Sequence, residues 1–65
     1  MTYKQACRKA STRARKSSGH IFVMREIDPY TDETVYEIAT EHELDSWYLG
    51  DTPIAAFAPD GLRDD

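Results

Sequence analysis

The sequence predicts a small α+β protein in which an N-terminal helix packs on an antiparallel β-hairpin. Two capping-box patterns, at Thr2 and at Thr40, mark the starts of two helices. Between them, two runs rich in β-branched and aromatic residues flank a turn sequence in residues 20–40. The expected order is helix, strand, strand, helix, strand. A chain of 65 residues is short enough that we expect one domain, 1–65, with a small core.

The first element expected is a basic helix over residues 2–18. Thr2 and Gln5 have capping-box spacing, and Gly19 suits the left-handed position that ends many helices. Apolar residues recur every three or four positions, which predicts one narrow stripe of mostly small side chains facing a sheet. The stripe consists of Tyr3, Ala6, Cys7, Ala10 and Ala14.

The hairpin follows, with strands over 20–27 and 34–38 and a four-residue loop over 29–32. Asp28 is expected to bond forward to the backbone, Pro29 to preset a turn dihedral, and Asp32 to tolerate a left-handed conformation. A loop of this length sets Asp28 opposite Glu33. Counting back from there, the paired residues are Ile27 and Thr34, Arg25 and Tyr36, Val23 and Ile38, and Ile21 and Thr40.

This register divides the hairpin into two faces, whereas a slip of one residue mixes them and sets Arg25 opposite Glu37. The first face is expected in the core and holds Ile21, Val23, Ile27, Tyr36 and Ile38. The second face is half apolar and half acidic, with Phe22, Met24 and Ala39 beside Glu26, Val35 and Glu37.

Three further segments complete the chain. Thr40 and Glu43 repeat the capping box, which predicts a short acidic helix over 41–49 whose inward face is Leu44, Trp47 and Tyr48. The small and apolar residues 54–58, between two prolines, predict an edge strand. The acidic tail over 62–65 is expected to fray.

Charge is sharply segregated along the chain. Residues 1–19 carry six Lys and Arg and no acid, whereas residues 20–65 carry two Arg and all 12 acids, and the whole chain has a formal charge of −4. This asymmetry indicates charged partners. The alternative is that the basic helix lies against the acidic remainder and neutralises it internally.

No catalytic, metal or cofactor motif is present, so we expect a protein that is not an enzyme and that uses no cofactor. His20 at a strand start and His42 in an exposed helical turn both have ordinary structural explanations. The lone Cys7 is expected to be a small buried residue, with a reactive thiol or an intermolecular disulfide as the alternatives. One cysteine without a signal sequence favours the cytoplasm, and no run of residues is long and apolar enough for a membrane span.

The leading functional interpretation is a protein-binding module. Acids that ring an apolar patch favour docking on a basic surface of another protein, because complementary charge speeds encounter and the apolar centre supplies affinity. The alternative is a solvated face that aids solubility. The candidate contact residues are Phe22, Met24, Glu26, Asp28, Asp32, Glu33, Glu37 and Asp45.

The rival interpretation is a nucleic-acid-binding regulator that uses the basic helix. Six cations within 13 positions are enough to contact several phosphates, in a salt-sensitive way. The overall acidic balance and the lack of aromatic residues between the cations count against this interpretation. The candidate contacts are Lys4, Arg8, Lys9, Arg13, Arg15 and Lys16.

In length and charge segregation the chain resembles, in a general way, the small proteins that phages and mobile elements make to bind and inhibit host machinery. The resemblance is one of type and involves no specific motif. It implies a partner among host proteins, such as one that handles nucleic acid, and a site of action in the host cytoplasm. A small core and an edge strand are also compatible with a homodimer, although no residue pattern selects one.

Overall fold

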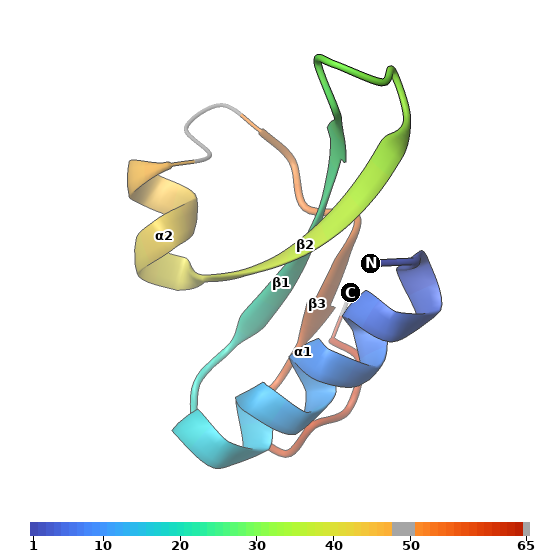
Figure 1. Ribbon diagram of the computed structural model, residues 1–65. Helices are drawn as coiled ribbons and strands as arrows, with labels where there is room; N and C mark the ends of the chain where they lie inside the picture. Colours follow the sequence, from blue (N-terminus) through green and yellow to red (C-terminus); the bar gives the residue numbers. More distant parts are fainter. Residues whose placement is uncertain (48–50, 65) are drawn as a thin grey trace.

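The computed structural model describes residues 1–47 and 51–64, and its elements follow the expected order. They are α1 (Tyr3–Ser17), β1 (Ile21–Ile27), β2 (Thr34–Thr40), α2 (Glu41–Ser46) and β3 (Ala55–Phe57). The strands form one antiparallel sheet in the order β2-β1-β3, so the hairpin contributes the central strand and β3 is an edge strand. Figure 1 shows α1 lying across this sheet and α2 standing apart from it beside β2. The protein is therefore a mixed α+β fold, as predicted.

Small side chains let α1 lie close to the sheet. Ala6, Ala10 and Ala14 are fully buried, and they share the core with residues from all three strands. The N-terminus of α1 has the predicted capping box, in which the Gln5 backbone N–H donates to the Thr2 hydroxyl and the Gln5 side chain accepts from the Thr2 N–H. The rest of the core cluster consists of Ile21, Val23, Ala55 and Phe57, with Cys7, Tyr36, Ile38 and Ile54 packed at its margin.

The left-handed residue at the end of α1 is Ser18 and not Gly19. Ser18 has a φ of 53°, and Gly19 is not among the residues with positive φ. The chain therefore reverses one residue earlier than the sequence predicted. A non-glycine residue in this conformation is strained, since its Cβ crowds the backbone.

The predicted hairpin register is correct at every position, from Ile21 opposite Thr40 to Ile27 opposite Thr34. The turn also forms as expected. The Asp28 carboxylate accepts a hydrogen bond from the Tyr30 N–H at 2.8 Å, and Asp32 has a φ of 59°. Ile27 is an exception to the predicted core face, because it is 67% exposed and does not belong to the core cluster.

Three expectations for the second half of the chain need correction. The helix predicted over 41–49 ends at Ser46, and Trp47, which was expected to face inward, is 74% exposed; Tyr48 and Leu49 lie outside the described residues. The strand predicted over 54–58 is limited to Ala55–Phe57, although the Ile54 N–H still donates to the Val23 carbonyl.

The tail predicted to fray instead folds back on β3. Arg63 forms an antiparallel bridge with Phe57, and the Asp64 N–H donates to the Ala56 carbonyl at 2.9 Å. The turn that makes this return contains Gly61, which has a φ of 84° and lies against the side chain of Arg15 in α1. The Ser11 hydroxyl donates to the Gly61 carbonyl at 2.6 Å, so α1 holds the turn in place. Asp65 lies outside the described residues.

Candidate interaction surfaces

The residues predicted for the acidic surface occupy three places in the structure. Asp28, Asp32 and Glu33 lie in or next to the hairpin turn, which projects at the top of Figure 1 away from α1 and α2. Asp45 lies on α2. The remaining four residues, Phe22, Met24, Glu26 and Glu37, share the sheet face opposite α1, because they alternate along β1 and β2 with the residues that face the core.

The centre of that sheet face is not open, which corrects the prediction for Met24. Met24 lies directly opposite Glu37 in the register, but its side chain is only 1% exposed, and the neighbouring Ala39 is fully buried. Phe22 and Glu26 are half-buried, and Glu37 is exposed. Met24 therefore belongs to the interior of the folded protein and offers no contact area to a partner.

The hairpin turn presents one aromatic ring among carboxylates. Tyr30 is 95% exposed, next to the exposed Asp32 and Glu33. Asp28 has a structural role here, because its carboxylate accepts from Tyr30 and its backbone N–H donates to the Glu33 carbonyl. These bonds fix the turn, so Tyr30 is presented on a defined scaffold.

The acidic helix α2 repeats this combination of acids and an exposed ring. Its first turn contains Glu41 and Glu43, and Trp47 directly follows its last residue. The Glu43 carboxylate accepts from the Thr40 backbone N–H at 3.0 Å, and this bond is the main reason why the pKa of Glu43 lies below its ordinary value of 4.5. Burial opposes the shift, while the Thr40 hydroxyl and the positive charges of Arg13 and His42 add to it. The lowered pKa keeps Glu43 ionised, and its negative charge lies in the first turn of α2, where it interacts favourably with the helix dipole.

Sequence reasoning missed the strong exposure of two aromatic residues, Tyr30 and Trp47. Tyr30 follows Pro29 within a turn, and turn positions are usually on the surface, so the sequence held a usable signal for it. Trp47 was assigned to the inner face of a longer helix because it lies three residues after Leu44. Since α2 ends at Ser46, this helical spacing does not continue to Trp47.

The predicted basic surface lies wholly on α1, and all six of its cations are exposed. Within residues 1–47 and 51–64, no carboxylate forms an ion pair with any of these six side chains. Internal neutralisation through ion pairs, the alternative raised by the sequence, is therefore not seen in the described part of the chain. One of these cations still acts on the acidic half, because the charge of Arg13 helps to lower the pKa of Glu43.

The outer side of α1 is also hollowed. An open hollow of about 450 Å³ is lined by Met1, Gln5, Arg8, Lys9 and Thr12. The last four are spaced three and four residues apart and so share one face of the helix. Two cations and two neutral hydrogen-bonding side chains thus meet at one place on the basic surface.

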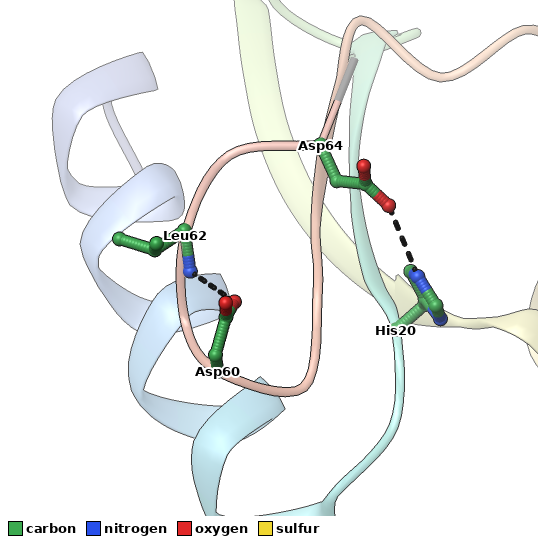
Figure 2. A network of polar contacts seen from close by, with 4 residues as sticks. All are labelled: His20, Asp60, Leu62 and Asp64. Atoms are coloured by element: carbon green, nitrogen blue, oxygen red, sulfur yellow. Dashed lines mark hydrogen bonds and ion pairs between the residues drawn. The ribbon is translucent and has the colours of Figure 1, made fainter.

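A polar contact joins the returning tail to the start of β1. His20 Nε2 lies 3.2 Å from Asp64 Oδ2, and Figure 2 shows the two side chains facing each other across the gap between the segments. In the turn that precedes the returning tail, the Asp60 carboxylate accepts a hydrogen bond from the Leu62 N–H at 3.0 Å. Both side chains of this contact are exposed, at 41% and 58%, so the contact fixes the tail only weakly.

Neither metal-ligand clusters nor membrane-spanning helices are found in the described part of the chain. No group of three or more His, Cys, Asp and Glu residues there is arranged to hold a metal ion. The helices are too short and too polar to cross a bilayer. Comparison of the chain with family models, with curated proteins and with solved structures finds no match.

Proposed function

We propose that this protein is a small, non-enzymatic binding module that docks on a host protein through its acidic side. In this proposal it acts in the host cytoplasm as an inhibitor or adaptor of the kind made by phages and mobile elements. The observation that carries it is the exposure of Tyr30 and Trp47, at 95% and 74%, beside the acids of the turn and of α2. Tyr and Trp, together with Arg, are the residue types that most often dominate binding energy at protein interfaces.

Charge strengthens this proposal and defines the partner. Asp32, Glu33 and Glu37 are exposed, and α1, which carries the cations, packs on the opposite face of the sheet. The acidic side is therefore available to a basic surface, such as the nucleic-acid channel of a host protein, and complementary charge would speed the encounter. Because Met24 is buried, the apolar contact in this proposal comes from the rings of Tyr30 and Trp47 and from the half-buried Phe22.

The test is capture of partners from a nuclease-treated host lysate, followed by binding measurements on the purified partner. Reversing the charges of Asp32, Glu33 and Glu37 to Lys is expected to abolish binding, and Tyr30→Ala to weaken it at least tenfold. Tyr30→Phe is the matched control, since it keeps the ring and only removes a solvated hydroxyl. All these side chains are exposed, so the midpoint temperature of thermal unfolding is expected to change little. Unchanged affinity in the charge-reversed protein would refute the proposal.

A second candidate function is a nucleic-acid-binding regulator that uses α1. It is favoured by the exposure of all six cations, by their lack of ion pairs within the described residues and by the hollow at Arg8 and Lys9. The cations lie on two flanks of the helix, with Lys4, Arg8 and Arg15 on one and Lys9, Arg13 and Lys16 on the other. One strand of phosphates would meet about three of them.

Three phosphate contacts predict that affinity for duplex DNA falls about 40-fold between 50 and 200 mM salt. Fluorescence anisotropy with labelled DNA and RNA measures this directly. Replacing Arg8 and Lys9 by Gln should lower affinity and flatten the salt dependence. Replacing two exposed acids, Asp51 and Asp60, by Asn is a control in which binding should not fall. Absence of binding to DNA and RNA at 50 mM salt would exclude this candidate.

A further inference from the structure

The outer edge of β2 has no strand beside it among the described residues. The sheet order places β2 at one edge and β3 at the other. The edge at β3 is covered by the returning tail, in which Arg63 bridges Phe57 and the Asp64 N–H donates to Ala56. No comparable segment within residues 1–47 and 51–64 pairs with the outer edge of β2. One of the two edges of the sheet is therefore protected and the other is open.

The register shows which backbone groups of β2 are free. The Val23 carbonyl accepts from Ile54, so the backbone groups of Val23 point toward β3. In an antiparallel ladder, the backbone N–H and C=O groups of successive residues point alternately to the two neighbouring strands. Two residues that lie directly opposite each other either exchange both backbone hydrogen bonds or exchange none. The residues of β1 that bond to β2 are therefore the alternate ones, Phe22, Met24 and Glu26, and their partners in the register are Ala39, Glu37 and Val35.

It follows that Thr34, Tyr36 and Ile38 direct their N–H and C=O groups away from the sheet. The next outward residue, Thr40, agrees with this pattern, because its N–H is satisfied by the Glu43 carboxylate of the capping box and not by β1. None of the three outward residues bonds to another described residue through these groups. They form a row of three donors and three acceptors along the outer edge of β2.

β2 also lacks the features that usually protect an edge strand. Proline, lysine, an inward-pointing charge or a bulge normally prevents an edge from pairing with another chain. β2 contains no proline and no lysine, and its pairing with β1 is continuous over seven residues. Its one charged residue, Glu37, projects from the sheet face and does not block the edge. The strand is therefore competent to add another strand.

From this edge we infer that two copies of the chain pair antiparallel through β2, with Tyr36 of one copy opposite Tyr36 of the other, to form a six-stranded sheet. Only outward residues can exchange hydrogen bonds, so successive allowed registers differ by two residues. Moving the second strand by two residues in one direction sets Glu37 opposite Glu37 of the second copy. Moving it by two residues in the other direction sets Glu33 opposite Glu37 of the second copy. Since like charges directly opposite are unfavourable, the register centred on Tyr36, in which Glu37 faces Val35, is selected.

The side chains support the same register. Tyr36 is half-buried and makes an edge-to-face contact with Tyr3, at a ring-centroid distance of 5.5 Å and an interplanar angle of 70°. Pairing at Tyr36 brings two such tyrosine pairs together on one face of the sheet. Thr34 then neighbours Ile38 of the second copy, so a half-buried isoleucine loses further contact with water. The occupant of this edge is thus a second copy, because the strand is complementary to itself in charge and side-chain character.

Amide hydrogen exchange, measured by NMR on the whole chain across a range of concentrations, tests this pairing together with sedimentation equilibrium. At low concentration the amides of Val35 and Glu37 should be protected, while those of Tyr36 and Ile38 exchange fast. As the dimer forms, the Tyr36 and Ile38 amides should become protected. A chain that stays monomeric to millimolar concentration, or a dimer in which these two amides remain unprotected, would overturn the inference.

Three variants sharpen the test. Thr34→Pro removes an outward N–H without touching the bonds to β1, so it should weaken dimerisation at least tenfold, whereas the matched Thr34→Ala keeps the N–H and should dimerise like the natural chain. Val35→Lys places an ammonium group opposite Glu37 of the second copy at two symmetric positions. It should tighten the dimer roughly 2- to 30-fold. Equal dimerisation of the Pro and Ala variants, or weaker dimerisation of Val35→Lys, would contradict the proposed pairing.

Discussion

Replacing Met24 by alanine distinguishes between two descriptions of the second sheet face. The sequence predicted an open docking patch there, whereas the structure shows Met24 buried. If Met24 were part of an open docking patch, its loss would affect partner binding and leave stability nearly unchanged. Its side chain is instead 1% exposed, and burying such a side chain is worth about 2–5 kcal/mol relative to alanine. A chain of 65 residues has a total stability of about 3–10 kcal/mol. Met24→Ala should therefore remove a large share of it.

Ile27→Ala is the matched control, since Ile27 lies on the same strand and has a side chain of similar size. Ile27 is 67% exposed, so its replacement should cost no more than about 1 kcal/mol. Urea denaturation followed by circular dichroism measures both changes at low protein concentration. Each kcal/mol corresponds to about 4–8 °C in Tm, which places the Met24 variant at least about 8 °C below the natural protein. Equal stability of the two variants would refute the burial of Met24 and reopen it as a contact residue.

Four further predictions concern local backbone geometry and capping, each read from thermal denaturation. Gly61→Ala should destabilise by about 1–2 kcal/mol, because Gly61 has a φ of 84° and an added Cβ would lie 2.7 Å from Cγ of the neighbouring arginine in α1; a change near zero would contradict this. Ser18→Gly should stabilise by up to about 1 kcal/mol by relieving its left-handed conformation, while Gly19→Ala, whose added Cβ would come no closer than 3.8 Å to another atom, should not destabilise. Thr40→Ala should cost about 1 kcal/mol through loss of the capping box, and no loss would show that the cap is unimportant. Glu43→Gln should be less stable than the natural chain at neutral pH, and because the pKa of Glu43 is lowered by folding, this difference should vanish as the pH falls below about 4.5; a difference that persists in acid would exclude the charge as its cause.

Local patterns in the sequence predicted the helix starts, the hairpin turn and the strand register. Both capping boxes depend on side chains three residues apart, so Thr2 with Gln5 and Thr40 with Glu43 specify their own geometry. The register follows from the length of the turn and from the bonds that Asp28 makes to the residues after it. These interactions lie within a few residues, and no distant part of the chain is needed to infer them.

Element ends and burial were harder to predict, because they depend on segments far apart in the sequence. The tail over 62–64 is ordered by Phe57 and by α1, through Ser11 and Arg15. Nothing in the acidic tail itself indicates those contacts. The exposure of Trp47 likewise depends on where α2 stops, and the spacing of apolar residues alone did not show that position.

What the sequence alone determined is the order of elements, the pairing of the hairpin and the separation of charge between α1 and the rest of the chain. Which sides of these elements are covered depends on how the elements pack together. α1 covers one sheet face, the second face is closed around Met24 and Ala39, the tail protects the edge at β3, and no other described strand pairs with the edge of β2. The physical reason is that hydrogen bonds between near neighbours are encoded locally, whereas burial depends on where distant segments meet.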